Sequence, residues 1–157
     1  MAITVVNSQG TKAYLVAEGT TLATVANVET AIASADAILC IQTFGDISSS
    51  RSVQEYKCLS SDETAKSIGS ISLGNISLEL LFNSADSAGQ AELRSMYADN
   101  TKREMIIELN DEGTTSPSYV VFTVAVASEA VSIAKDAAVL YKNTIEICSL
   151  PVLFEAV

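Results

Sequence analysis

The segment YVVFTVAVA, residues 119–127, alternates side chains with a period of two, which is the pattern of a β-strand. One face of this strand carries Val120, Phe122, Val124 and Val126. The opposite face is apolar as well, with Val121, Ala125 and Ala127. A strand that is apolar on both faces is buried on both faces. The pattern does not show what covers the second face. It could be a helix of the same chain or a neighbouring molecule.

The same alternation recurs along most of the chain. Ile76, Leu78, Leu80 and Phe82 share one face of a second strand, with Ser77 and Glu79 on the other. Further strands are expected over residues 14–17, 38–44, 53–59, 105–109 and 145–147, and residues 131–134 extend the long strand. Many short strands of this kind indicate a sandwich or a barrel.

One segment, residues 86–99, breaks the alternation and predicts an amphipathic helix of about three turns. Ser87 and Gln90 have the spacing of a capping box, and Asp86 adds negative charge at the helix start. The expected apolar face is Gly89, Leu93, Met96 and Tyr97, and the expected water-facing side chains are Gln90, Glu92, Arg94 and Ser95. Residues 29–37 have the pattern of a short second helix.

We therefore expect a single domain over residues 1–157, mainly β. The predicted architecture is a two-sheet antiparallel β-sandwich or barrel flanked by one α-helix, with a long extended loop. No apolar run reaches the roughly 18 residues of a membrane span. The first residues lack the basic start of a secretory signal, so we expect synthesis and assembly in a cytoplasm.

The chain is acidic, with 19 Asp and Glu against 9 Lys and Arg and a net charge of −10. Tight nucleic-acid binding depends on Lys and Arg that displace counterions from phosphates, so this composition excludes it. There is no His, and the carboxylate pairs Asp62–Glu63 and Asp111–Glu112 lie in polar loops that favour solvated acids. We predict no enzyme, and no catalytic, cofactor or metal site. Cys40, Cys58 and Cys148 are expected to be buried core thiols.

The stretch GDISSSRSVQEYKCLSSDETAKSIGS, residues 45–70, is too polar for a core and too long for a turn. Two interpretations remain open: an arm that contacts another subunit, or a long hairpin folded on its own subunit. The arm is favoured because long loops are uncommon unless they are functional.

Three segments together resemble the major tail tube protein of long-tailed, lambda-type bacteriophages. They are ILCIQTFGDISSSRSVQEYKCLSS (38–61), GSISLGNISLELLFNSADSAGQAELRSMYADNTKREMIIEL (69–109) and YKNTIEICS (141–149). The most specific parts are a strand of the form G-x-x-S-x-x-L-x-F over 74–82 and a helix core with Gly89, Gln90, Ala91 and Leu93. Residues 1–37 form an N-terminal segment of which the first thirty match no part of the family pattern.

The resemblance implies a structural subunit that assembles into hexameric rings. The rings stack into a tube in a phage tail, through which the genome passes without specific binding. Implied partners are other copies and the tail initiator, length-determining and terminator proteins; implied locations are the virion and, during assembly, the host cytoplasm. Predicted inter-ring arm residues are Asp46, Arg51, Glu55, Lys57, Asp62 and Lys66. Predicted lumen-lining residues are Glu79, Glu108 and Glu146.

Two other functions remain open from the residues. One is a tube subunit of a secretion or contractile injection system, which shares the ring architecture. The other is a monomeric β-sandwich binding module, which the absence of Trp and the 6% aromatic content disfavour.

Overall fold

The computed structural model describes residues 7–57, 59, 62–110 and 117–155. Within these residues the chain forms ten strands and two helices. The elements are β1 (Asn7–Ala17), α1 (Val25–Ile32), β2 (Asp36–Ile38), β3 (Ile41–Phe44), β4 (Ser49–Lys57), β5 (Thr64–Leu73), β6 (Asn75–Leu81), α2 (Gly89–Asp99), β7 (Lys102–Asn110), β8 (Tyr119–Ser132), β9 (Leu140–Ile147) and β10 (Val152–Phe154).

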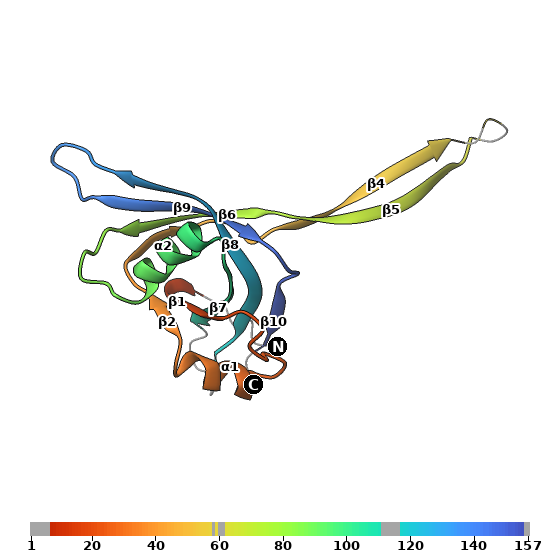
Figure 1. Ribbon diagram of the computed structural model, residues 1–157. Coiled ribbons are helices and arrows are strands. Elements are labelled where there is room, and N and C mark those ends of the chain that lie inside the picture. The colour runs from red at the N-terminus through yellow and green to blue at the C-terminus, as the bar shows by residue number, and fades with distance from the viewer. Residues whose placement is uncertain (1–6, 58, 60–61, 111–116, 156–157) are drawn as a thin grey trace.

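Eight strands form one antiparallel sheet in the order β2-β1-β7-β8-β9-β6-β3, with β10 paired to the start of β8. This sheet curls around α2, while β4 and β5 leave it as a separate two-stranded ribbon (Figure 1). The mainly β, antiparallel architecture predicted from the alternation is confirmed. The second sheet is this projecting ribbon, and two helices are present where one flanking helix was expected.

The inner face of the curled sheet and α2 enclose the main core. Its members include Leu15, Ile76, Leu78, Leu80, Leu93, Met96, Met105, Phe122, Val124, Tyr141 and Ile145, each at most 2% exposed. The core contains alternate strand positions that the sequence pattern placed on one face, among them Ile76, Leu78, Leu80, Phe122 and Val124. Burial of this many large apolar side chains is the main stabilising contribution to the domain.

A smaller core lies on the other face of the sheet, beneath α1. It contains Val16, Val28, Ala31, Ile106, Tyr119 and Val121. The Thr24 side chain caps α1 by accepting a hydrogen bond from the Asn27 backbone N–H at 3.3 Å. The second apolar face of β8 is therefore covered at Val121 by the chain's own helix. The predicted helix over residues 29–37 was misplaced, because β2 begins at Asp36 and pairs with β1.

Helix α2 starts at Gly89, three residues later than predicted. Both Asp86 carboxylate oxygens accept backbone hydrogen bonds, from Ala88 at 2.9 Å and from Gln90 at 3.2 Å, so Asp86 organises the helix start. Leu93 and Met96 are buried as expected. The prediction that Gln90 faces water was wrong. Its side chain is fully buried and joins α2 to the end of β6 through Leu81 O at 2.7 Å.

The prediction of buried core thiols was wrong for two cysteines. Cys40 and Cys148 are free and exposed. Cys40 lies between β2 and β3 with φ of 61°, so the strand predicted over 38–44 is broken by a tight bend at this residue. Cys58 lies outside the described residues. No helix in the described part of the chain has the length and apolar character needed to cross a membrane.

Candidate assembly surfaces

Strands β4 and β5 form a hairpin arm, defined here as residues 49–73. Its ladder runs from Ser49 opposite Leu73 to Lys57 opposite Thr64. Every residue of β4 is exposed, and the arm projects away from the curled sheet (Figure 1). The alternative of a hairpin folded on its own subunit is therefore wrong. The polar segment, for which the sequence left two interpretations open, is an extended ribbon with almost no contact to the body of its own chain.

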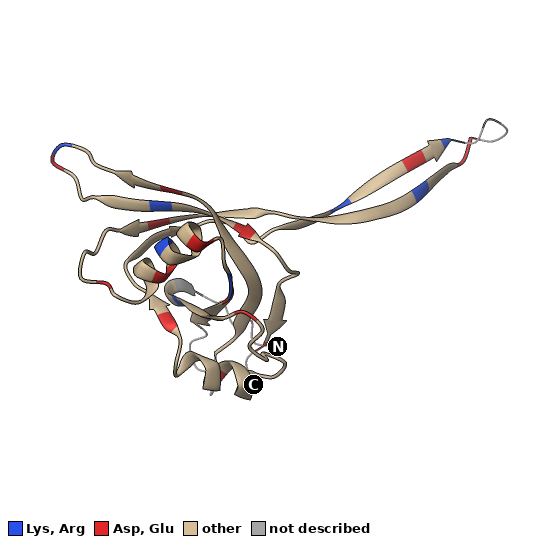
Figure 2. Cartoon of the chain, viewed as in Figure 1, with Lys and Arg blue, Asp and Glu red and all other residues tan. Residues whose placement is uncertain are grey.

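The predicted arm charges are distributed along this ribbon. Within the described part of the arm, one pair of them forms an ion pair: Lys66 Nζ lies 2.8 Å from Glu55 Oε1, and both side chains are more than half exposed. Arg51, Lys57 and Asp62 are exposed on the arm, and Asp46 is exposed just before β4. Figure 2 shows that basic and acidic residues alternate along the arm.

The net charge of the arm is zero. It contains three basic residues, Arg51, Lys57 and Lys66, and three acidic residues, Glu55, Asp62 and Glu63. Since the whole chain carries −10, the remaining residues carry the entire net charge. Another acidic copy therefore does not repel the arm by its net charge.

One face of the arm carries an apolar stripe, defined as Val53, Ile68 and Ile71. Val53 lies opposite Ile68, and Ile71 lies opposite Arg51. The register shifts between these two pairs, and the shift returns Ile68 to the face of Ile71. Leu73, at the base of the same face, packs against the main core. The stripe therefore continues the core surface outward, although Val53 is 57% exposed and Ile68 is 68% exposed.

The bulge within the arm contains a glycine. A Cβ at Gly69 would lie 2.2 Å from Ser52 Oγ, so a larger residue here would require the Ser52 side chain to rotate away. Sequence reasoning missed the stripe because the extra residue hides its period. Ile71 and Leu73 alternate correctly, whereas Ile68 is out of phase with them.

A groove opens between β1 and the edge strand β3, at the root of the arm. Its volume is about 760 Å³. The residues that line it are all uncharged: Gln9, Gly10, Thr11, Ala13, Ile41, Gln42, Thr43, Phe44, Ile47, Ile107 and Leu109. Ile41, Phe44, Ile47 and Leu109 are partly buried side chains packed against the main core. The groove is therefore an uncharged, largely apolar depression that reaches the core.

The three predicted lumen acids lie on one face of the sheet, the face opposite the main core. The ladders place Glu146 opposite Asn75 and Ala125, Glu79 opposite Lys142, and Glu108 opposite Lys12. Because side chains alternate in a strand, these registers give the three acids the same orientation.

Two of the three acids are ion-paired. Glu79 contacts Lys142 at 3.0 Å, and Glu108 contacts Lys12 at 3.1 Å and accepts a hydrogen bond from the Tyr14 hydroxyl at 3.3 Å. The hydrogen bond to Glu108, with its charge, raises the pKa of Lys12. Glu146 is exposed. That this face lines a lumen stays a prediction.

The extended end of the β8–β9 hairpin meets α2 at a polar and aromatic cluster. The Arg94 guanidinium lies 5.9 Å from the ring centres of both Phe82 and Tyr141. The Tyr141 hydroxyl donates a hydrogen bond to Glu129 at 2.8 Å. Burial, followed by this hydrogen bond, raises the pKa of Tyr141 well above its ordinary range. This cluster anchors the hairpin to the body of the domain.

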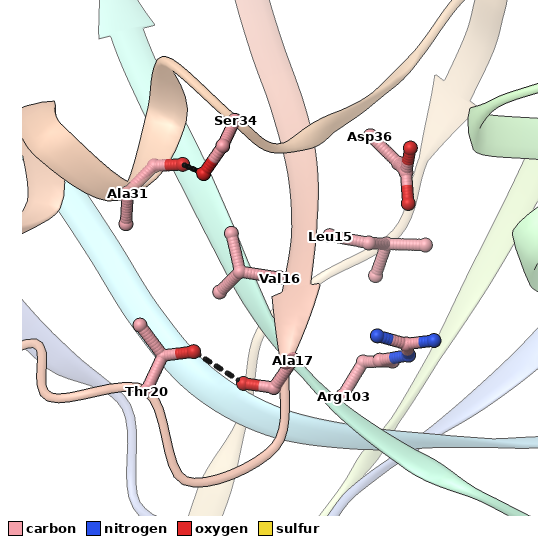
Figure 3. A pocket seen from close by; sticks show the side chains of 8 residues that line it. All are labelled: Leu15, Val16, Ala17, Thr20, Ala31, Ser34, Asp36 and Arg103. Atoms are coloured by element: carbon pink, nitrogen blue, oxygen red, sulfur yellow. Dashed lines mark hydrogen bonds between the residues drawn. The ribbon is translucent and has the colours of Figure 1, made fainter.

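A small pocket of about 240 Å³ lies between α1, β1 and the start of β7 (Figure 3). Thr20 and Ser34 donate hydrogen bonds to the carbonyls of Ala17 and Ala31. Its charged residues are Asp36 and Arg103, and Arg103 is ion-paired to Glu92 of α2. These contacts stabilise the fold. Across the described ranges, His, Cys, Asp and Glu form no group of three that could hold a metal.

No protein-family model and no curated protein matches this chain. Solved structures do match over nearly its whole length. A chain of the SPP1 tail tube is 13% identical with a TM-score of 0.67, covering 96% of this chain and 80% of the SPP1 chain. A chain of the tail of the empty gene transfer agent particle is 14% identical with a TM-score of 0.66, covering 96% and 99%. A chain of the sheath–tube complex of the PVC extracellular contractile injection system is 12% identical with a TM-score of 0.69, covering 98% and 93%.

The fold is therefore the tail-tube fold. It is shared by the phage tube, the gene transfer agent tail and the tubes and terminators of contractile injection systems. The resemblance drawn from the sequence is confirmed at the level of the fold.

Proposed function

We propose that this chain is a structural subunit of a phage-type tail tube. Its copies self-assemble into hexameric rings, and the rings stack into a conduit for genome delivery. The observation that carries this proposal is a tail-tube fold over nearly the full length together with an arm that is exposed along all of β4. The related gene transfer agent tail was determined with six-fold symmetry, which supports the ring stoichiometry.

In this assembly the arm makes the contacts between rings. The charges at Asp46, Arg51, Glu55, Lys57, Asp62 and Lys66 then meet complementary groups of a neighbouring copy. Each exposed ion pair contributes little alone. A ring presents every contact once per copy, so weak contacts add through effective concentration.

The face that carries Glu79, Glu108 and Glu146 lines the lumen in this proposal. A basic lumen would bind each passing phosphate, whereas an acidic or neutral one lets DNA slide without specific binding. The pairing of Glu79 with Lys142 and of Glu108 with Lys12 keeps this face from a large local excess of negative charge.

The tube subunit sits in the virion tail and, before that, in the host cytoplasm. Its further partners are the proteins that initiate the tube, set its length and terminate it. Among the related structures are a baseplate and a tube-terminating cap of the anti-feeding prophage, which supports partners at both ends of a tube.

A tube subunit of a contractile injection system is the second candidate. It is favoured by TM-scores of 0.69 and 0.71 to injection-system chains, against 0.67 to the SPP1 tube. Purified particles discriminate the two: a phage-type tail is attached to a capsid that holds DNA, and an injection device carries protein cargo with no nucleic acid.

Sedimentation velocity across a concentration series tests self-assembly. The comparison is a variant in which an Asn-Gly turn joins Arg51 directly to Ile71, two cross-strand partners, so that the arm shortens without losing its base. We expect large species from the intact chain and only single rings or monomers from the variant. Monomers from the intact chain at every concentration would contradict the proposal, and equal assembly by both chains would contradict the role of the arm.

A further inference from the structure

We propose that the apolar stripe of the arm, Val53, Ile68 and Ile71, docks into the uncharged groove between β1 and β3 of a second copy of this chain. The inference rests on the proposed function and adds the receptor surface that the arm binds. The proposal combines two observations, one on each surface. Val53 and Ile68 of the stripe are exposed apolar side chains, and the groove is an apolar depression with no occupant from the described part of its own chain.

The stripe has the composition of a buried surface. Ile68 is 68% exposed and Val53 57% exposed, and they are direct cross-strand partners on one face. Toward the body, the same face merges with the main core through Leu73. Toward the tip, it ends at the exposed Lys66–Glu55 ion pair. Charged groups thus border the apolar patch toward the tip, as they normally border the apolar centre of an interface.

The groove has matching chemistry. Its lining contains no charged residue, and Ile41, Phe44, Ile47 and Leu109 supply apolar surface that extends to the core. A volume of about 760 Å³ accommodates several aliphatic side chains. One wall is β3, which ends the sheet order and pairs only with β6 among the described strands. An approaching strand of the arm therefore also finds an edge strand with which to pair.

Charge favours the arm of another copy as the occupant. The body surrounding the groove carries the whole net charge of −10, so acidic segments are repelled from it. The arm is net neutral, and its three basic residues are spread along the ribbon, with Arg51 opposite Ile71 on the face of the stripe (Figure 2). A neutral, apolar-faced ribbon therefore approaches an acidic body without net electrostatic repulsion.

The arm does not reach the groove of its own chain. Phe44 and Ile47 of the groove immediately precede β4, and the ribbon runs outward from that point (Figure 1). The contact therefore joins two different surfaces, the arm of one copy and the root of the arm of another. Passed from each copy to the next, such heterologous contacts build a ring when the rotation closes and an open stack when it does not.

The test uses two single-cysteine proteins in a background with Cys40, Cys58 and Cys148 replaced by Ser. One carries Ile68→Cys on the stripe and the other carries Thr43→Cys, an exposed lining residue of the groove. Mixed and mildly oxidised, they form a disulfide-linked heterodimer only when the arm of one copy reaches the groove of another. Tyr56→Cys is the matched arm control, because Tyr56 lies on the opposite face and is 54% exposed. We expect 68–43 cross-links in large excess over 56–43 cross-links.

A substitution measures the contribution of the stripe. Ile68→Asp is expected to raise the concentration needed for stacking at least about tenfold, since it removes a buried aliphatic contact. Tyr56→Asp introduces the same charge on the opposite face and is expected to change that concentration less than about threefold.

The outcomes separate the two proposals. Stacking by the intact chain with 68–43 cross-links supports the docking site. Stacking without those cross-links, or with Ile68→Asp no weaker than Tyr56→Asp, overturns the docking site and leaves the tube function standing. No association of the intact chain at any concentration overturns the proposed function as well.

Discussion

Gly89 of α2 lies directly against the backbone of Ala37 in β2. A Cβ at position 89 would lie 2.3 Å from the Ala37 carbonyl oxygen and 2.7 Å from the Ile38 Cα. The first turn of α2 therefore touches the end strand of the sheet with no room for a side chain. This contact holds α2 inside the curled sheet, where Leu93 and Met96 complete the main core.

Gly89→Ala is expected to destabilise the domain by about 1–3 kcal/mol, because the helix must move away from β2 to admit the methyl group. Ala98→Val, at an exposed position of the same helix, is the control and should change stability by less than about 1 kcal/mol. Urea unfolding followed by circular dichroism measures both variants. Equal stability of Gly89→Ala and the parent chain would show that the contact between α2 and β2 is not tight.

Gln90→Leu removes the two hydrogen bonds that link α2 to the end of β6. Gln90 accepts from the Asn83 backbone N–H at 3.1 Å and donates to the Leu81 carbonyl at 2.7 Å. Leucine leaves both backbone groups without a partner, at a cost of about 1–3 kcal/mol. Gln54→Leu, on the exposed arm, is the matched control and should be close to neutral. Urea midpoints that fall equally for the two variants would contradict this role of Gln90.

The raised pKa of Tyr141 predicts loss of stability in alkali. The unfolded tyrosine ionises near pH 10, whereas the buried folded form keeps its proton to higher pH. The unfolded state therefore binds fewer protons above pH 10, and the free energy of unfolding falls there by up to about 1.4 kcal/mol per pH unit. Below pH 10 this contribution is fully present.

Tyr141→Phe tests this dependence by urea unfolding at pH 8 to 11. The variant should be less stable at neutral pH, because the hydrogen bond to Glu129 is lost, and its stability should fall less steeply with pH. The pKa values of Tyr14 and Tyr119 are raised too, first by burial, so part of the slope remains. An unchanged slope in Tyr141→Phe would assign the alkaline loss to other groups.

Glu146→Lys is expected to make assembled tubes retain nucleic acid. Glu146 is exposed on the face assigned to the lumen, and each substitution changes that face by two charges per copy. Binding of a fluorescent oligonucleotide to assembled tubes should rise about tenfold or more at low salt and disappear at high salt. Glu18→Lys, an exposed charge change outside the sheet, is the control. Equal binding by the two variants would contradict the lumen assignment.

The strands and α2 could be predicted because their signals are local. Alternation within residues 76–80 and 122–124 indicates a buried face directly. The core contains the apolar residues of that face, Ile76, Leu78, Leu80, Phe122 and Val124. Gln90 could not be predicted as buried, because its partners at Asn83 and Leu81 lie in the preceding turn and strand. The exposure of Cys40 depends on the bend between β2 and β3, which an apolar run conceals.

The assembly surfaces were harder to predict than the core. Polarity and length identified residues 45–70 as unusual, and the charged residues of the arm followed from that. The apolar stripe stayed hidden because the bulge near Gly69 shifts Ile68 out of phase with Ile71. The groove joins Gln9–Thr11 to Ile107 and to Ile41, which are far apart in sequence and meet only when the sheet curls.

Electron microscopy of the purified intact chain across a concentration series tests the central claim most directly. We expect hollow tubes or stacked rings, with end views that show six-fold symmetry around an open channel. Compact particles without a channel at every concentration, or closed assemblies of another symmetry, would contradict it.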